Sequence, residues 1–420
     1  MNSAVPKYRL RTNSVAPKHR LRTKVAIPTP ERSMATPVRI AVIGCGYWGM
    51  NYVRVFNELP DARVVAVCDK SPERLQELTG RFPGVYLTTE TEEVASRRDV
   101  DAVVVCTLAT THHDVTRIFL REGKHVLVEK PLTTTVADAD ELIALAEAKS
   151  AILMVGHTFI FNAGIRKVKE YNQPGEGRVY YVYARRTNLG PIRRDVNAVW
   201  DLAPHDIAIF NYLLGSVPEW VSAVGGKVLR NCREDLGFIS LGYPDNVLGH
   251  IQVSWADPNK AREVVIVRSD RRIVFNDLNG LEQVRVFEKG VSAVEAEPLN
   301  YGESHFQIRD GDIISPRIEA SEPLKNQCRH FLECVKLGKQ PISSGTEGRE
   351  VVRVLEAVNR SIECKGLQIN VRSNGHQNAN TLEDIAGGFS GSRSPVPYDR
   401  RRNPGSNTTS HPGIGFHSGP

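Results

Sequence analysis

The sequence contains no long apolar run. Of its 420 residues, 41% are hydrophobic and 24% are charged, and no stretch reaches the roughly 18 uninterrupted apolar residues that a membrane helix needs. The first forty residues also lack the apolar centre of a secretory signal. We therefore expect a cytoplasmic globular protein of two or three domains, with no membrane partner.

Paired cysteines are also missing. The seven cysteines lie far apart along the chain, and none belongs to a CxxC pair. This pattern predicts reduced thiols that are mostly buried. We expect no zinc site or other metal site and no disulfide framework.

The body of the chain carries no basic excess. The formal net charge is +6, but residues 1–37 hold eight Lys or Arg and one acidic residue. The rest is close to neutral, so we expect no specific nucleic-acid partner, although the basic extension could bind nucleic acid weakly by charge alone. That extension contains two near copies of a proline-containing basic unit, Ala4–Thr12 and Val15–Thr23, which predicts disorder.

Other readings of the first residues stay open. An Arg-rich organelle transit peptide is one, although the prolines oppose the amphipathic helix that it needs. Met34 is a candidate natural start, because folded-looking sequence begins at Val38. We also expect disorder over residues 373–420, where Gly, Ser, Asn, Pro and Arg dominate.

From Val38, apolar runs alternate with helical patterns. Near-continuous Val, Ile and Ala runs are typical of parallel strands buried on both faces. The alternation predicts a Rossmann domain over residues 38–156, with a doubly wound parallel sheet. The expected strands are 38–43, 63–68, 100–106, 125–128 and 151–155, and the expected helices are 51–59, 72–79, 113–122 and 138–149.

The second half has a different pattern. Segments that alternate apolar and polar residues, or are rich in β-formers, are separated by turn residues and predict an open, mainly antiparallel mixed sheet in a second α/β domain over residues 157–372. We expect helices around 204–214, 324–337 and 345–364 to cover one face of this sheet. Its C-terminal part could also pack back on the first domain. The strand candidates are 178–185, 220–229, 238–242, 248–254, 263–267 and 284–287.

A glycine-rich turn follows the first expected strand. Gly44, Gly46 and Gly49 fit the G-x-G-x-x-G pattern between a strand and a helix, which is the context of a dinucleotide site. Gly44 permits the tight turn, Gly46 lets the backbone approach the pyrophosphate, and Gly49 lets the helix pack closely. Asp69 closes the second strand, where a carboxylate binds the ribose 2′-hydroxyl and favours NAD over NADP. Lys70 and Arg74 weaken that preference, and Asp69 could instead be a turn residue.

Two further segments carry reactive side chains. Lys130, in Glu129-Lys130-Pro131, follows a strand whose carboxyl end should face the ligand crevice. Its charge could polarise a substrate oxygen, although such a segment can also be an exposed turn. Asp201 and His205 are four residues apart, and Pro204 is expected to begin the following helix. His205 suits proton transfer from an alcohol, and Asp201 could orient its ring or hold a neighbouring hydroxyl. The alternative is a capping Asp beside an unrelated surface histidine.

The ordered motifs GxGxxG, VVAVCD, GKHVLVEKPL, MVGHTF and WDLAPHDI resemble the glucose–fructose oxidoreductase / inositol dehydrogenase / MocA (Gfo/Idh/MocA) family over Val38 to Val371. The resemblance implies Lys130, Asp201 and His205 as catalytic residues and a cis peptide before Pro131. It also implies a second-domain sheet that assembles homodimers or homotetramers. The expected binders of NAD, with NADP as the alternative, are Gly44, Gly46, Tyr47, Trp48, Gly49, Asp69, Thr107, His112 and Glu129.

The family motif is not complete. After the fourth strand many members carry a proline where this chain has Leu108, a change that should alter a loop lining the cofactor without abolishing binding. His112 fits the family pattern and is expected near the nicotinamide ribose. His157 also fits it, as a substrate binder, although a packed core histidine is the alternative.

An arginine-rich stretch precedes the expected catalytic helix. It resembles the bacterial subgroup that oxidises the 3-hydroxyl of UDP-N-acetylated hexosamines and hexosaminuronates. Arg186 and Arg194 suit a pyrophosphate or a uronate, and Asn188 and Asn197 suit hydroxyls or an acetamido group. The stretch could instead be a solvated cationic loop. The alternatives are therefore a free-sugar or inositol-type dehydrogenase and, in another class, a non-catalytic NAD(P)-sensing regulator.

Overall fold

The computed structural model describes residues 36–173, 175, 177–190, 192–193, 195–229, 232–293 and 306–372. Most of the expected N-terminal extension, Met34, Arg194 and the expected tail from Ser373 lie outside the described residues. No helix within the described ranges is long and apolar enough to cross a membrane. All seven cysteines are free thiols, and Cys232 and Cys364 are exposed.

The first sheet is six-stranded and parallel, with the order β3-β2-β1-β4-β5-β6. The order reverses between β1 and β4, and in such sheets ligands bind in the crevice beyond the carboxyl ends of these strands. Its strands are β1 (Val38–Ile43), β2 (Ala62–Cys68), β3 (Tyr86–Thr88), β4 (Ala102–Val105), β5 (His125–Glu129) and β6 (Leu153–Gly156). Its helices are α1 (Tyr47–Glu58), α2 (Pro72–Thr79), α3 (Thr91–Ser96), α4 (His112–Arg121) and α5 (Val136–Ala148).

The second sheet is nine-stranded and mixed, with the order β16-β13-β12-β11-β7-β10-β9-β8-β17. Only the pair β7–β10 is parallel, so the fold class expected from the sequence is confirmed. Its strands are β7 (Val179–Thr187), β8 (Trp220–Gly226), β9 (Leu236–Gly242), β10 (Leu248–Ser254), β11 (Ala261–Arg268), β12 (Arg272–Asn276), β13 (Val284–Phe287), β16 (Ile313–Ile314) and β17 (Ile369–Asn370). A separate pair joins β14 (Gly290–Ala293) to β15 (Phe306–Arg309).

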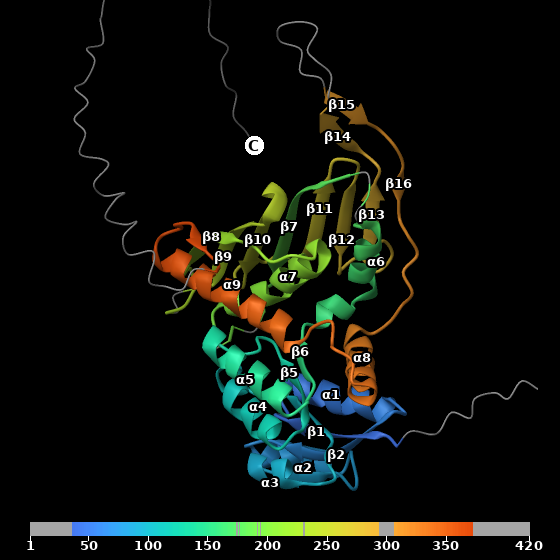
Figure 1. The fold of residues 1–420 in the computed structure, drawn as a ribbon, viewed down its shortest axis with the longest axis vertical. Coiled ribbons are helices and arrows are strands. Elements are labelled where there is room, and N and C mark those ends of the chain that lie inside the picture. The colour runs from blue at the N-terminus through green and yellow to red at the C-terminus, as the bar shows by residue number, and fades with distance from the viewer. Residues whose placement is uncertain are drawn as a thin grey trace, which may run out of the picture. The chain divides into compact units, whose positions relative to one another are not determined.

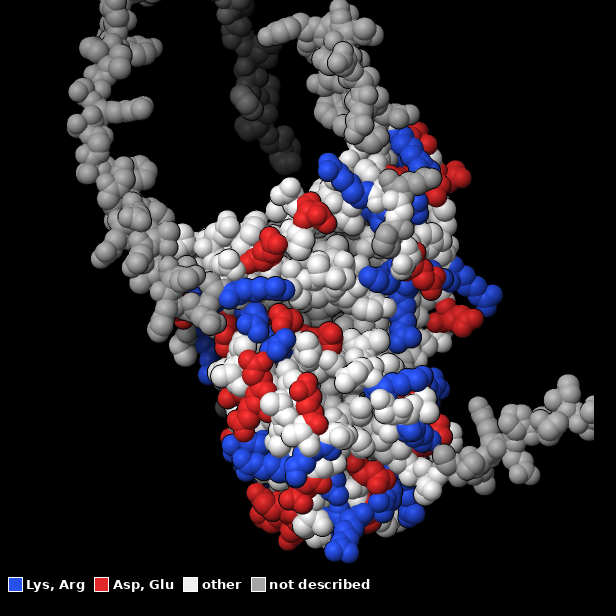
Figure 2. Space-filling view, viewed as in Figure 1, with Lys and Arg blue, Asp and Glu red and all other residues white. Residues whose placement is uncertain are grey.

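Helices cover one face of this sheet. Figure 1 shows α6 (Ala163–Tyr171), α7 (Ala198–Leu214) and α9 (Gly345–Glu363) on the same side. On the other face, Tyr181, Phe238 and Leu248 are 41–53% exposed. Across the view of Figure 2, acidic and basic side chains are interspersed, as a near-neutral body should show.

The expected start of α7 at Pro204 is wrong. The helix begins at Ala198, where the side chain of Asn197 accepts a hydrogen bond from Trp200 N at 2.9 Å, and Pro204 lies inside it. A proline inside a helix removes one backbone hydrogen bond but does not always end the helix. Asn197 supplies the stronger start signal, since an asparagine cap satisfies free N–H groups.

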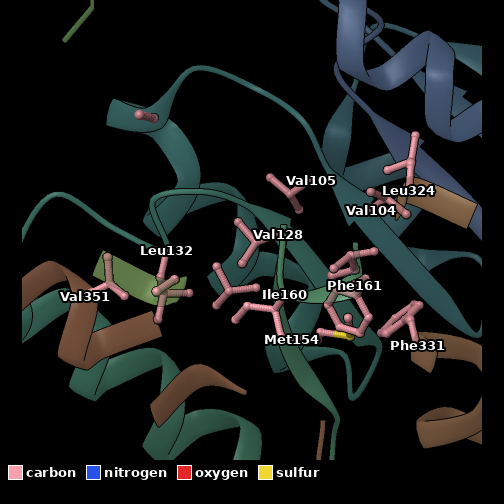
Figure 3. Close-up of a cluster of buried hydrophobic side chains, with 14 of the residues drawn as sticks. Val104, Val105, Val128, Leu132, Met154, Ile160, Phe161, Leu324, Phe331 and Val351 are labelled. Atoms are coloured by element: carbon pink, nitrogen blue, oxygen red, sulfur yellow. The ribbon is translucent and has the colours of Figure 1, made fainter. Parts of the chain in front are cut away.

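The expected place of the helix 324–337 is also wrong. This helix, α8 (Pro323–Leu337), packs against α1 and a short 3₁₀ helix, η2 (Thr158–Phe161), instead of covering the second sheet. In Figure 3 its residues Leu324 and Phe331 lie beside Val104 and Phe161. The amphipathic pattern of α8 identified an apolar face but not the surface that the face contacts.

Helix α9 also contacts the first sheet. The segment before it pairs with the edge of β6, where Val155 N donates to Ser343 O at 2.7 Å. A Cβ atom at Gly348 would lie only 2.5 Å from the Val155 side chain, so glycine there allows the close approach. Val351 reaches the same cluster as Leu132 and Val128 (Figure 3).

Candidate active site

The glycine-rich turn connects β1 to α1. Gly44 has φ +90°, and a Cβ atom there would lie 2.8 Å from Cys106 O. A Cβ atom at Gly49 would lie 1.8 Å from Gly44 O, whereas one at Gly46 would meet nothing within 4 Å. Gly44 and Gly49 therefore allow tight packing, and the backbone at Gly46 faces open space at the N-terminus of α1, where phosphates bind favourably.

A groove of about 630 Å³ begins at this turn. Its residues come from the ends of β1, β4 and β5 and from the loop before α7, so it lies at the reversal point of the parallel sheet. The open backbone at Gly46 and the polar walls fit a dinucleotide. The groove is lined by Gly46, Tyr47, Trp48, Cys106, Thr107, Leu108, His112, Glu129, Lys130, Arg193 and Asp195.

Asp69 lies directly beside the glycine-rich turn. Its carboxylate accepts hydrogen bonds from Cys45 N at 2.6 Å and from Ser71 N at 2.9 Å. Arg74 approaches the same carboxylate at 3.5 Å. Asp69 therefore braces the turn, and its position supports the ribose-binding role that we propose for it.

His112 connects the two loops at the base of the groove. Its Nδ1 lies 2.7 Å from Pro131 O and its Nε2 lies 3.2 Å from Thr107 O. Burial lowers the pKa of His112 to about 4 although both carbonyls oppose the shift. The neutral ring has only one N–H, so it can donate to only one of the two carbonyls, and the shorter distance favours Pro131 O. The expected cis peptide at Lys130–Pro131 is confirmed.

Glu129 belongs to a buried hydrogen-bonded chain beneath the groove. It accepts from Tyr52 Oη at 2.8 Å, and Tyr52 Oη accepts from Gln327 Nε2 at 2.6 Å. Burial raises the pKa of the Glu129 carboxyl, and the hydrogen bond from Tyr52 opposes this effect. Glu129 also accepts from Lys130 N at 3.1 Å, so the chain fixes the segment that carries Lys130.

Lys130 is directed at Asp201. Its Nζ donates to Asp201 O at 2.7 Å and to Asp201 Oδ1 at 3.3 Å. The Asp201 carboxylate also accepts from Arg193 and from Trp255 Nε1, each at 3.3 Å. Burial alone would raise the pKa of Asp201, but the charges of Lys130 and Arg193 outweigh it and hold that pKa below its usual value.

The expected orientation of His205 by Asp201 is not what the structure shows. Both carboxylate oxygens of Asp201 contact other donors, and Nδ1 of His205 has no hydrogen-bond partner among the described residues. The His205 ring instead forms a T-shaped pair with Phe159, with the ring centroids 5.1 Å apart. The four-residue spacing placed the two side chains on one helix, but the carboxylate turns toward Lys130.

His205 is neutral at pH 7. Burial, followed by the charges of Lys130 and Arg186, lowers its pKa well below the ordinary value. A neutral imidazole can accept a proton from an alcohol. The ring is half-buried and faces a second pocket, which has a volume of about 430 Å³.

This second pocket shares Tyr47, Trp48, Glu129 and Lys130 with the groove. Lys130 therefore stands where the two spaces meet. The remaining wall combines hydroxyl, amide and charged groups with apolar surfaces, which suits a polyhydroxylated molecule. It consists of Asn51, Thr158, Phe159, Asn162, Arg186, Thr187, Asn188, Leu202, His205, Arg262, Asp277, Glu322, Pro323 and Leu324.

The residues expected to bind substrate have different positions. Asn188 lines the second pocket, and so does Arg186, although its guanidinium is paired with Asp206 through two bonds of 2.8 Å. Asn197 caps α7 and donates to Glu234, so it is used inside the fold. His157 lines a separate cavity.

Sequence reasoning missed several residues of this region. Arg262 reaches the pocket because β11 pairs with β7 and places it opposite Arg186. Asn162 donates to Asp277, which also pairs with Arg262. Arg193 lines the groove, whereas the residue expected from the sequence was its neighbour Arg194. Two of these residues had a nearby signal, since Asn162 lies three residues after the MVGHTF motif and Arg193 lies next to Arg194 in the arginine-rich stretch.

No group of three or more His, Cys, Asp or Glu in the described part of the chain is arranged to hold a metal. The fold and the two adjoining spaces define a two-domain oxidoreductase that uses a dinucleotide. Residues 38–157 match the family described as "Oxidoreductase family, NAD-binding Rossmann fold", and residues 166–274 match "GFO/IDH/MocA C-terminal domain". The chain belongs to the Gfo/Idh/MocA oxidoreductase family, and its cofactor is NAD.

Similar proteins span most of the chain. Inositol 2-dehydrogenase of Rhizobium meliloti (strain 1021) is 25% identical and UDP-N-acetylglucosamine 3-dehydrogenase of Acidithiobacillus ferrooxidans is 25% identical, each covering 78% of this chain and 98% of its own. The crystal structure of a putative oxidoreductase from Magnetospirillum magnetotacticum MS-1 is 27% identical with a TM-score of 0.65. It covers 77% of this chain and 99% of its own.

Proposed function

We propose that the protein is a cytoplasmic NAD-dependent dehydrogenase for a secondary alcohol of a sugar. The observation that carries this proposal is Lys130, which lies between the cofactor groove and the pocket that contains His205. When bound, NAD supplies the acceptor or donor of a hydride. His205 takes the hydroxyl proton, Lys130 stabilises the developing negative charge on oxygen, and Asp201 positions Lys130.

The favoured substrate is a nucleotide sugar such as a UDP-N-acetylhexosamine or its uronate. Asn51 and Asn188 offer amide groups to hydroxyls and to an acetamido group, whereas the Asn162 side chain caps α6 and donates to Asp277. The side chain of Arg262 is 38% exposed and contacts one oxygen of Asp277 at 3.3 Å, so its guanidinium can also meet an anionic group. Similarity to the Acidithiobacillus enzyme supports this choice, and similarity to inositol 2-dehydrogenase supports a cyclitol or free sugar as the alternative.

The test is absorbance of reduced nicotinamide with purified protein, NAD or NADP, and a panel of UDP-sugars, free sugars and inositols. Signal with a UDP-N-acetylhexosamine or its uronate is the expected result. Signal with only an inositol or a free sugar would replace the favoured substrate. If no substrate gives a signal although NAD still binds, the result would favour a non-catalytic regulator. Release of a dinucleotide from the denatured protein would instead indicate an enzyme whose cofactor stays bound and is recycled.

Variants connect this activity to the site. His205→Asn and Lys130→Met should each lower kcat by roughly 10²–10⁴-fold, as is usual for groups that move a proton or stabilise a developing charge in the transition state. The affinity for NADH, measured by fluorescence, should change little. Unchanged turnover in either variant would remove that residue from the mechanism.

A further inference from the structure

The substrate pocket and a second cavity are lined by residues of the same two elements, η2 and α7. From η2, Phe159 faces the substrate pocket and Ile160 lines the cavity. From α7, His205 faces the pocket, whereas Ala208 and Asn211 line the cavity. The two spaces therefore lie on opposite sides of the same pair of elements.

The cavity has a volume of about 410 Å³ and reaches the surface. Its far wall comes from α9 and the segment before it, and three of these residues, Ile342, Thr346 and Glu347, are exposed. Carboxylates of Glu347 and Glu350 and the amide of Asn211 border a space that is otherwise mostly apolar. Water can enter such a space wherever two or more polar partners are within reach.

His157 lines this cavity at the start of η2. The residue is 2% exposed, and neither ring nitrogen has a hydrogen-bond partner in the described part of the chain. Buried polar groups without partners are rare and costly, so they need an explanation. The sequence suggested a substrate binder or a packed core histidine, and an apolar side chain would serve the second role without that cost.

His205 has a matching orphan atom. Its Nδ1 is buried and lacks a partner among the residues that the structure describes. The titratable groups that act on it are Lys130, Arg186, His157 and Arg262, and the carboxylates Asp206 and Asp277 are paired with the two arginines. A protonated His205 would thus stand among three cations and would lose its proton readily. Substrate and NAD would block the route through the pocket during the reaction.

We propose that His157 carries the proton from His205 to the second cavity while product is still bound. The inference rests on the proposed function. Oxidation of the alcohol delivers its hydroxyl proton to Nε2 of His205, and its hydride goes to the oxidised nicotinamide. Nδ1 of His205 then gives up its proton to one nitrogen of His157 through a bridging water molecule, because the two rings make no direct hydrogen bond. The other nitrogen of His157 releases a proton to water in the cavity. Both histidines end the cycle neutral but in the opposite tautomer, and exchange of their ring protons with water restores the starting tautomers after product leaves.

The test compares wild type with His157→Gln, which keeps a polar side chain but cannot accept and release protons at two nitrogens. Stopped-flow traces in weak buffer follow proton release with an indicator dye and nicotinamide reduction by absorbance. In wild type both should rise together, ahead of product release. In His157→Gln proton release should wait for product, and kcat should fall about tenfold, less than the roughly 10²–10⁴-fold loss of a direct acid–base group.

Two controls separate transfer from structure. Tyr212→Phe removes a hydroxyl from the same cavity and should leave both traces unchanged. His157→Ala should be rescued by added imidazole, and His157→Gln should not. Wild-type proton release that coincides with product release, or an unchanged His157→Gln, would overturn the relay.

A readout without turnover distinguishes failure of the relay from failure of the proposed function. Nitrogen-15 NMR of the histidine rings in the NAD-bound protein measures exchange of the His205 ring proton with water. This exchange should slow about tenfold in His157→Gln, in keeping with the loss of one transfer route. If no substrate is turned over, equal exchange rates would still reject the relay, and a slower rate would support it.

Discussion

The contacts of Asp201 change the role expected for this residue. Its carboxylate lies among Lys130, Arg193 and Trp255, so it controls the position and charge balance of the lysine. Sequence spacing suggested a histidine partner because residues four apart share a helix face. It could not show that Lys130, 71 residues away, approaches the same carboxylate.

Asp201→Asn should lower kcat by about ten- to a hundredfold, which corresponds to about 1.4–2.8 kcal/mol of lost transition-state stabilisation. An amide gives Lys130 a weaker partner and no compensating charge. The affinity for NADH should differ from that of the wild type by less than about twofold, because the lost interaction acts in the transition state and not in cofactor binding. Steady-state kinetics provide the measurement, with Asp140→Asn as the control, since Asp140 pairs with Arg349 and lines neither the groove nor the pocket.

Asp69→Ala should weaken NAD binding and narrow the preference over NADP. The carboxylate that would repel a 2′-phosphate is then absent. The unfolding free energy should also fall by about 1–3 kcal/mol, because Cys45 N and Ser71 N lose an acceptor. Dissociation constants for both cofactors and a denaturant titration separate the effects, and an unaltered cofactor preference would leave Asp69 with only the structural role.

At the scale of elements, Asn188 and Asn197 have opposite roles. Asn197 caps α7, so Asn197→Ala should cost about 1 kcal/mol of stability and leave KM for the sugar unchanged. Asn188 lines the pocket, so Asn188→Ala should raise KM and leave stability nearly unchanged. Thermal unfolding and kinetics on both variants provide a matched comparison, and a raised KM in Asn197→Ala would return that residue to the substrate site.

Local patterns were sufficient for most of the first sheet. Its strands are continuous apolar runs, and Gly44 and Lys130 stand directly after two of them, so adjacency in sequence fixed their place in the crevice. The same reasoning found β10 and β13 with their observed bounds. It missed β12, a five-residue strand with a charged first residue. It also missed Arg262, because strand register is set by pairing between distant segments rather than by local sequence.

At the scale of the whole molecule, buried neutral histidines should make stability depend on pH. Burial lowers the pKa of His112 to about 4 and that of His157 to about 3. Below the ordinary histidine pKa of about 6.5 the unfolded chain binds protons that the folded chain does not. Stability should therefore fall as the pH decreases from about 6.5 toward 4, by about 1.4 kcal/mol per pH unit for each histidine.

Urea unfolding at pH 7, 6 and 5 measures this slope. In His157→Gln the decrease in unfolding free energy per pH unit should be smaller by the contribution of one histidine. A slope that is the same in wild type and variant would mean that His157 is protonated in the folded protein.

The open face of the nine-stranded sheet is where we expect homodimers or homotetramers to form. Tyr181 stands opposite Leu248, and Val224 stands opposite Phe238, so exposed apolar side chains are neighbours across strands. Exposed apolar patches of this kind often mark interfaces between proteins. Phe238→Asp combined with Leu248→Asp should yield monomers in light scattering. Leu281→Asp, at a position 97% exposed outside the strands, is the control and should leave the mass unchanged.

The contact between β6 and the segment before α9 also bears on synthesis of the protein. Residues 343 and 344 complete the edge of the first sheet, and Val351 joins its core. The ribosome therefore releases β1 to β6 long before the residues that cover their last strand. A nascent chain of the first 160 residues carries an open, apolar strand edge, a feature that promotes pairing with other chains. Correct folding during synthesis should thus depend on chaperones, or on fast translation, between the end of β6 and the segment that covers it.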